Sequence, residues 1–140
     1  MSWLLDTNVL SELRKGGRAD RGVQAWFGEV NEPELFTSVL VVGEIRRGIE
    51  LVRRRDVPSA LALEQWLRRL VETFGHRLLP IDARVAERWG TLNVPDPVPA
   101  VDGLLAATAL VHDLTLVTRN VPDMQRTGVQ LLDPFDSVRG

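Results

Sequence analysis

The 140-residue sequence has no cysteine, only two histidines and a single lysine, Lys15. The absence of cysteine excludes disulfides, thiolate metal sites and a cysteine nucleophile, and it fits a reducing compartment. His76 and His112 have no distinctive motif around them, so a Ser-His-Asp triad is not indicated. No apolar run approaches the length of a membrane span, and no basic stretch precedes the first apolar residues. We therefore expect a cytoplasmic protein without a signal peptide.

Positive charge is scarce overall and comes almost entirely from arginine. The net charge of -2 provides no general attraction to nucleic acid, but arginines cluster at positions 46–47, 53–55 and 68–69. Arginine binds phosphate through two parallel hydrogen bonds, which makes Arg46 and Arg47 candidate substrate-binding residues. The alternative is a solvated helix face with local ion pairs.

Hydrophobic residues make up 44% of the chain, enough for a core, and the length suits one domain over residues 1–140. Apolar periodicity predicts strands at residues 3–5, 35–37, 78–81, 114–117 and 129–132. Helices are predicted at 8–15 and 20–30, from the cap Ser38 to about 52, from Pro58 to about 71, from the cap Asp82 to about 92, and at 101–112. This alternation predicts an α/β fold, in which helices cover both faces of a mainly parallel sheet.

Acidic and polar residues fall where functional sites form in such sheets, at the carboxyl ends of the strands. Asp6 ends the first strand, and the 114–117 strand is followed by Thr118, Asn120 and Asp123. Glu44 lies among apolar positions of the helix after the second strand, and Asp102 opens the helix at 101–112. Each acid taken alone also fits a helix cap, a solvated position or a turn.

The joint placement of the four carboxylates is what suggests chemistry. Converging carboxylates repel one another, and a bound divalent cation relieves that repulsion. Ligand sets of oxygen atoms, without cysteine and with little histidine, favour a hard ion such as Mg²⁺ or Mn²⁺. Such an ion can activate a water and stabilise charge on a phosphoryl group. The pattern predicts a metal site built from Asp6, Glu44, Asp102 and Asp123.

Four segments, in order, resemble the motifs of PIN domains: residues 4–10 (LLDTNVL), 38–48 (SVLVVGEIRRG), 99–109 (PAVDGLLAATA) and 116–123 (LVTRNVPD). Residues 118–120 and the closing segment 128–135 are similar to VapC-type toxins, especially their FitB-like branch. The resemblance implies a PIN-like α/β/α sandwich, Mg²⁺-dependent endoribonuclease activity, a homodimer and inhibition by a cognate antitoxin. It also implies that Asp6, Glu44, Asp102 and Asp123 are the metal-binding acids, with Thr118 and Asn120 as polar residues beside the metal.

The resulting hypothesis is a toxin that cleaves RNA phosphodiesters with a metal-activated water. Asp6 and Asp102 are expected to hold the first ion, and Glu44 and Asp123 to complete or extend the site. Thr118 is expected to hydrogen-bond a carboxylate or hold the water, and Asn120 to orient Asp123 or touch the substrate. Arg46 and Arg47 are expected to contact RNA phosphates or an acidic antitoxin segment. The second helix and the helix carrying Glu44 are expected to form the antitoxin groove.

Two other classes of function remain as alternatives. The first is a metal-binding PIN module that acts mainly as co-repressor with its antitoxin, touches operator DNA only through that complex and has little nuclease activity. The second is a phosphotransfer enzyme on a similar sheet. The second acid of a haloacid-dehalogenase motif is replaced by Asn8, and Lys15 is misplaced for a receiver domain. Glycine-rich phosphate loops are also absent, which weighs against the second class.

Overall fold

Five short strands form a parallel sheet at the centre of the computed structural model, which describes residues 1–136; residues 137–140 of the expected domain lie outside the described residues. The strand order is β3-β2-β1-β4-β5, and every neighbouring pair is parallel. Their bounds are Trp3–Leu5 (β1), Leu35–Ser38 (β2), Leu78–Leu79 (β3), Thr115–Val117 (β4) and Leu131–Leu132 (β5). The predicted α/β class with a parallel sheet is confirmed.

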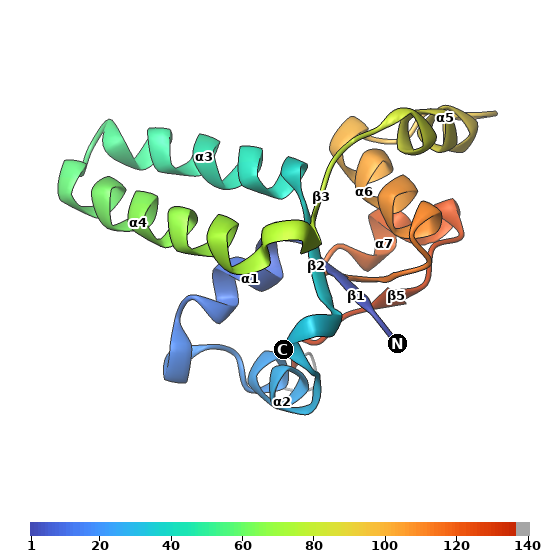
Figure 1. Cartoon of the computed structure of the whole chain (residues 1–140). Coiled ribbons are helices and arrows are strands. Elements are labelled where there is room, and N and C mark those ends of the chain that lie inside the picture. Colours follow the sequence, from blue (N-terminus) through green and yellow to red (C-terminus); the bar gives the residue numbers. More distant parts are fainter. Residues whose placement is uncertain (137–140) are drawn as a thin grey trace.

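Helices cover the sheet on both sides (Figure 1). Their bounds are Thr7–Leu13 (α1), Arg21–Glu29 (α2), Val39–Arg53 (α3), Val57–Phe74 (α4), Ala83–Leu92 (α5), Ala100–Val111 (α6) and Val121–Met124 (α7). Helix α3 packs along α4, and α5 packs along α6. In Figure 1 these two pairs lie on opposite sides of the strands, which is the expected sandwich.

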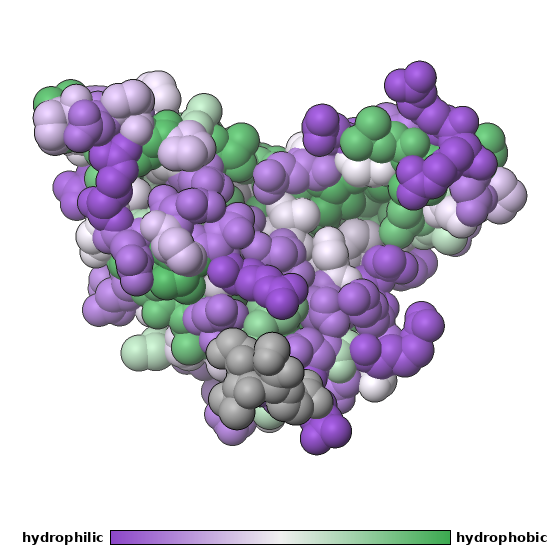
Figure 2. Space-filling model, turned by 180° about the vertical axis from the view of Figure 1, so that it is seen from behind, coloured by the Kyte–Doolittle hydropathy of each residue, from purple (hydrophilic) through white to green (hydrophobic). Residues whose placement is uncertain are grey.

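The central strand β1 is apolar because both faces of the sheet are covered. Leu4 pairs with Phe36 of β2 and Leu116 of β4, and Leu4 and Leu116 are completely buried. The surface carries mostly hydrophilic side chains, and hydrophobic ones gather in the hollow between the two helical pairs (Figure 2). Within residues 1–136, none of the helices has both the length and the apolar character needed to cross a membrane.

Several boundaries differ from the sequence-based expectations for local reasons. The strand expected at 78–81 stops at Leu79, because Pro80 has no backbone N–H to donate to a neighbouring strand. The strand expected at 129–132 is reduced to its last two residues. Asp123, expected in a loop or short turn, lies in the single-turn helix α7. Pro122 fits there because the N–H groups of the first helical turn have no partner within the helix.

The strand order identifies the place where a site is expected. From β1 the chain builds outward through β2 and β3, and it then returns to add β4 and β5 on the other side of β1. The carboxyl ends of β1 and β4 therefore flank the point at which the winding reverses. In open parallel sheets, ligands bind in the crevice outside this point. The residues directly after these two strands are Asp6 and Thr118.

Candidate active site

Asp6 is held at the carboxyl end of β1 by both main-chain and side-chain contacts. Its N–H donates to the carbonyl of Val117 at 3.0 Å, which continues the pairing of β1 with β4. Its carboxylate caps α1, because Oδ1 accepts the N–H of Thr7 at 2.7 Å. Oδ2 accepts the hydroxyl of Thr118, also at 2.7 Å. The side chain thus has one orientation, set by two neighbouring elements.

Asp6 is only 5% exposed, an unusual setting for a carboxylate. Burial raises the pKa of Asp6 above its ordinary value, while the hydrogen bonds from Thr118 and Thr7 lower that pKa in part. No arginine or lysine forms an ion pair with this carboxylate within residues 1–136. A buried acid without a cationic partner is a candidate ligand for an external cation.

Thr118 is the centre of a small hydrogen-bond network at the end of β4. Besides donating to Asp6, its fully buried hydroxyl oxygen accepts the N–H of Asn120 at 3.0 Å and the side-chain amide of Asn8 at 3.5 Å. The amide oxygen of Asn8 in turn accepts the N–H of Arg119 at 3.2 Å. The first turn of α1 is thereby tied to the loop that follows β4.

Glu44 approaches the site from helix α3, which begins after β2. The buried Ser38 caps this helix by accepting the N–H of Leu40 at 3.0 Å. Val41 and Ile45 are buried, while Glu44 between them is exposed. Its Oε1 accepts the hydroxyl of Thr7 at 2.6 Å, so Glu44 and Asp6 both contact the same residue.

Asp102 enters from the first turn of α6, on the other helical pair. Burial raises the pKa of Asp102, and the negative charges of Asp6, Asp123 and Glu44 raise it further. Asp102 is therefore the acid that interacts electrostatically with each of the other three. Gly103 allows the helix start to pack closely, because a Cβ there would lie 2.5 Å from Cγ2 of Val98.

The four acids are gathered but not drawn together into a finished coordination sphere. Within residues 1–136, no group of three or more acidic or histidine side chains has the spacing of a preformed metal site. Mutual repulsion between carboxylates is a sufficient physical reason for this separation. The four side chains nevertheless offer carboxylate oxygens, two of them on partly or fully buried residues, and a hard divalent cation prefers oxygen ligands of this kind.

The comparisons with known proteins give the family. A model described as "PIN domain" matches residues 3–128 of the chain. The chain belongs to the PIN-domain family. "Toxin FitB" of Neisseria gonorrhoeae is 30% identical, covering 94% of this PIN domain and 97% of the relative. "VapC ribonuclease Y4jK" of Sinorhizobium fredii is 28% identical, covering 95% and 97%.

Solved structures agree with the sequence relatives. The crystal structure of FitAcB from Neisseria gonorrhoeae contains a chain that superposes on this PIN domain with a TM-score of 0.85. That chain is 29% identical, and the match covers 94% of this chain and 97% of the other. A structure of FitAB bound to an IR36 DNA fragment gives a TM-score of 0.83 at 27% identity, covering 96% of each chain. Both comparisons span nearly the whole domain.

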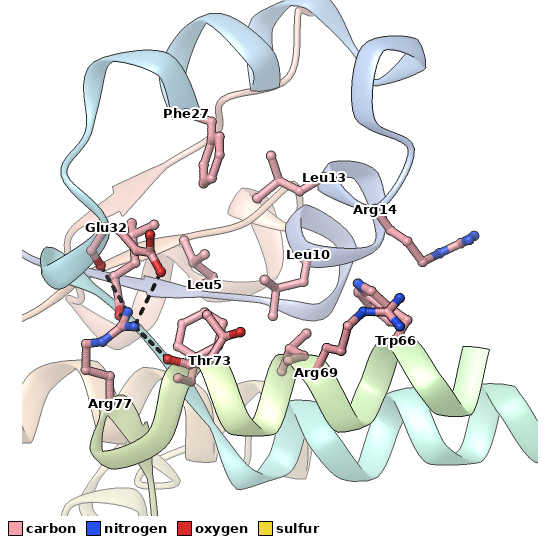
Figure 3. Close-up of a pocket in the computed structure, with 13 residues that line it drawn as sticks. Leu5, Leu10, Leu13, Arg14, Phe27, Glu32, Trp66, Arg69, Thr73 and Arg77 are labelled. Atoms are coloured by element: carbon pink, nitrogen blue, oxygen red, sulfur yellow. Dashed lines mark hydrogen bonds and ion pairs between the residues drawn. The ribbon is translucent and has the colours of Figure 1, made fainter. Parts of the chain in front are cut away.

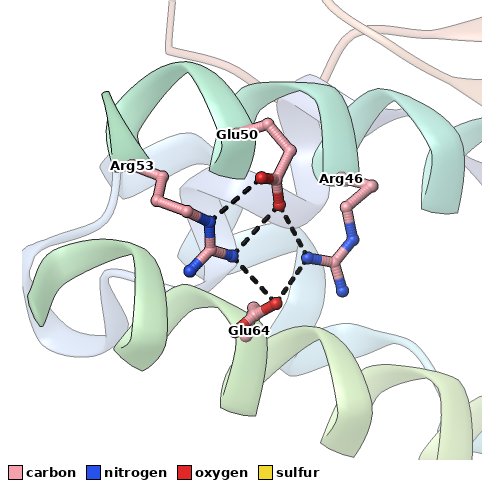
Figure 4. Close-up of polar contacts among 4 residues, drawn as sticks. All are labelled: Arg46, Glu50, Arg53 and Glu64. Atoms are coloured by element: carbon pink, nitrogen blue, oxygen red, sulfur yellow. Dashed lines mark hydrogen bonds and ion pairs between the residues drawn. The ribbon is translucent and has the colours of Figure 1, made fainter. Parts of the chain in front are cut away.

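Arg46, expected to contact substrate, is already engaged within this PIN domain (Figure 4). Its guanidinium pairs with Glu50 at 3.0 Å and Glu64 at 2.7 Å, and Arg53 pairs with the same two acids. The pairs with Glu64 join α3 to α4, and the hydrogen bonds from Arg53 and Arg46 lower the pKa of Glu50 to about 2. The alternative of local ion pairs therefore describes Arg46, whereas the neighbouring Arg47 is exposed and has no such pair within residues 1–136.

Two residues of the site were not singled out from the sequence: Thr7 and Asn8. Both lie in the PIN-like segment at residues 4–10, and Asn8 begins the helix predicted at 8–15, but neither is among the predicted site residues. In the structure the hydroxyl of Thr7 donates a hydrogen bond to Glu44, and the side-chain amide of Asn8 donates one to Thr118. Asn120 supplies its backbone N–H to Thr118, and within the described part of the chain its side chain makes no hydrogen bond to Asp123. Their position directly after Asp6, at the end of a strand, is the sequence feature that indicates a role for Thr7 and Asn8 in the site.

Proposed function

We propose that this PIN domain is a Mg²⁺- or Mn²⁺-dependent endoribonuclease and the toxin of a toxin–antitoxin pair. The observation that carries the proposal is the buried Asp6 at the β1/β4 winding reversal, together with Asp102, whose pKa is raised by burial and by the negative charges of Asp6, Asp123 and Glu44. Relatives that align over almost the whole chain are named as a toxin and as a VapC ribonuclease, which supports the same chemistry.

Asp6 and Asp102 would hold the ion, because burial raises the pKa of both acids. A bound cation would offset the cost of keeping these buried carboxylates ionised. Glu44 and Asp123, which are exposed, would complete the site from its rim. Thr118 keeps the Asp6 carboxylate in a single orientation. A divalent ion bound here supplies an activated water and offsets the charge on the phosphodiester.

Substrate contact is assigned to Arg47 in preference to Arg46. Both follow Glu44 on α3, but the guanidinium of Arg46 is shared between Glu50 and Glu64. Arg47 is exposed three residues from Glu44, about one helical turn away, so it lies on the same side of the helix. An unpaired guanidinium near the acids can bind an RNA phosphate without first breaking an ion pair.

The antitoxin is proposed to occupy a cavity of about 400 Å³ between α1, α2 and α4 (Figure 3). Its lining is mainly apolar, with arginines at its edge, which suits an amphipathic segment carrying acidic residues. Lining residues include Leu10, Leu13, Phe27, Trp66, Arg14 and Arg69. Of the two helices expected to form the groove, α2 contributes Phe27, whereas α3 lines a neighbouring cleft with Thr7 and Glu44.

Homodimer formation and operator binding are part of the same proposal. The net charge of -2 does not favour direct attachment to DNA, so contact with an operator is assigned to the antitoxin. The structure of FitAB with a DNA fragment supports this arrangement by similarity. The co-repressor role is therefore expected in addition to nuclease activity.

The proposal is tested with purified protein, a mixture of structured RNAs and Mg²⁺. We expect cleavage that EDTA abolishes and that Asp6→Asn and Asp102→Asn each reduce by about 100-fold or more, because each removes an ionised ligand. Asp96→Asn, an exposed acid of the loop before α6, is the matched control and should cleave at the wild-type rate. Folded Asp6→Asn protein with full activity would contradict the mechanism. Absence of cleavage by the wild type, together with antitoxin-dependent operator binding, would support the co-repressor alternative.

A further inference from the structure

Thr7 is the one residue of the described chain that contacts two of the four acids through different groups. Its backbone N–H donates to Oδ1 of Asp6 at 2.7 Å, and its hydroxyl donates to Oε1 of Glu44 at 2.6 Å. The second distance is at the short end of the range for a hydroxyl bonded to an oxygen. Asp6 directly follows β1, whereas Glu44 lies on α3, 37 residues after Thr7 in the sequence. Thr7 therefore links two acids that come from separate elements through hydrogen bonds to both.

Glu44 needs such a contact more than Asp6 does. Asp6 is buried and oriented by Thr118 as well as by Thr7. Glu44 is exposed, its side chain has three rotatable bonds, and within residues 1–136 the Thr7 hydroxyl is its hydrogen-bond partner. A long exposed side chain without a partner samples many rotamers, most of which face solvent. The hydroxyl selects the rotamers that bring the Glu44 carboxylate to Thr7, the residue whose backbone N–H binds Asp6.

We propose that Thr7 is a positioning residue, which holds the Glu44 carboxylate beside Asp6 and thereby strengthens divalent cation binding at the acid cluster. The inference rests on the proposed function, because it assumes that the cluster binds a cation. A purely structural role for Thr7 at the first position of α1 would instead affect folding stability and leave the cation affinity of the folded protein unchanged.

The test titrates Mn²⁺ into the metal-free protein in the absence of RNA. The electron paramagnetic resonance signal of free Mn²⁺ measures how much of the ion is bound. Thr7→Val removes the hydroxyl while keeping the branched shape, and Thr7→Ser keeps the hydroxyl. We expect Thr7→Val to weaken Mn²⁺ binding by about 10-fold, the scale for losing a group that orients a ligand. Thr7→Ser should bind close to the wild-type affinity. Thermal unfolding of each variant shows whether it is folded, and Thr7→Ala serves as a second hydroxyl-free variant.

A double-mutant comparison with Glu44→Gln identifies the path of the effect. If Thr7 acts through Glu44, Thr7→Val should add little to the loss already caused by Glu44→Gln. Independent, additive losses would overturn the inference, as would wild-type Mn²⁺ affinity in folded Thr7→Val and Thr7→Ala. Failure of the proposed function is distinguishable, because in that case the wild-type protein itself would not bind Mn²⁺.

Discussion

Replacing Thr118 by valine isolates the hydrogen bond that orients the buried acid. The two side chains have nearly the same volume, and Thr118 is completely buried, so the exchange leaves no sizeable cavity. It removes the 2.7 Å bond from the Thr118 hydroxyl to Asp6, an acceptor for the N–H of Asn120 and the long 3.5 Å bond from the side-chain amide of Asn8. Asn120 is exposed, so its N–H can turn to water. The main loss therefore falls on the Asp6 carboxylate.

The expected size of this loss follows from the charge of the acceptor. Hydrogen bonds to charged groups contribute about 1.5–3 kcal/mol, and neutral ones about 0.5–1.5 kcal/mol. Thr108→Val is a matched control, because Thr108 is also completely buried and its hydroxyl donates at 2.7 Å to the neutral carbonyl of Leu104. Near neutral pH we expect Thr118→Val to lower the free energy of unfolding by about 2 kcal/mol and Thr108→Val by about 1 kcal/mol.

The two losses should also differ in their pH dependence. Burial raises the pKa of Asp6 above 3.8, so the folded state binds this proton more tightly than the unfolded state does. Stability therefore falls as pH rises from 3.8 through the folded pKa. Thr118→Val raises that pKa further, since it removes a bond that favours the ionised form. The charge-dependent part of the variant's deficit is complete above its folded pKa and disappears below the ordinary value, where Asp6 is protonated in both states and the deficit is that of a neutral hydrogen bond.

Urea unfolding with EDTA present, followed by circular dichroism between about pH 4 and about pH 8, measures both effects. The Thr118→Val deficit should shrink toward the acidic end, while the Thr108→Val deficit should stay constant. Equal deficits at every pH for the two variants would refute the reasoning, because they would show that the Thr118 hydroxyl does not distinguish ionised from neutral Asp6.

Two further pairs of variants test the surface and the packing. Arg47→Ala should weaken the binding of uncleaved RNA to the metal-free protein. It should also reduce the slope of log affinity against log salt by about 1, as expected for one phosphate contact. Arg46→Ala should leave that slope unchanged and lower the melting temperature by breaking the ion pairs with Glu50 and Glu64. Gly22→Ala should destabilise the fold by about 1–3 kcal/mol, because its Cβ would lie 2.3 Å from the carbonyl oxygen of Pro134. Gly28→Ala, on the same helix with no atom within 4 Å of its Cβ, should be neutral or stabilising by up to about 1 kcal/mol. Equal slopes for the two arginine variants, or equal stabilities for the two glycine variants, would count against these assignments.

Much of the fold was predictable because its signals are local. Apolar runs followed by polar residues predicted all five strands, and side-chain caps such as Ser38 and Asp82 predicted where helices begin. The differences are the ends of short elements, where a single residue decides, the last turn of α4, which runs to Phe74, and the unpredicted single-turn helix α7. At β3 that residue is Pro80, which cannot extend the pairing with β2.

The arginines show where prediction from local pattern stopped. Arg46 and Arg47 are adjacent and were treated alike, yet only one of them meets Glu64 of α4. That contact depends on how α3 and α4 cross, and the spacing of charges within α3 does not contain this information. Local ion pairs at four-residue spacing, such as Arg46 with Glu50, were in principle readable from the sequence.

The acids divide in a similar way, and the division has a functional consequence. Asp6 is positioned by the main chain, since strand pairing and a helix start determine both its place and its burial. Glu44 is positioned by one side-chain contact on an exposed helix face. A strand end can therefore be recognised as a site from sequence, whereas the partner of Glu44 emerges only when α1 and α3 are placed together. On this reasoning the site combines a rigid acid at its base with an adjustable one at its rim, and substitutions at the rim should alter cation affinity more than they alter stability.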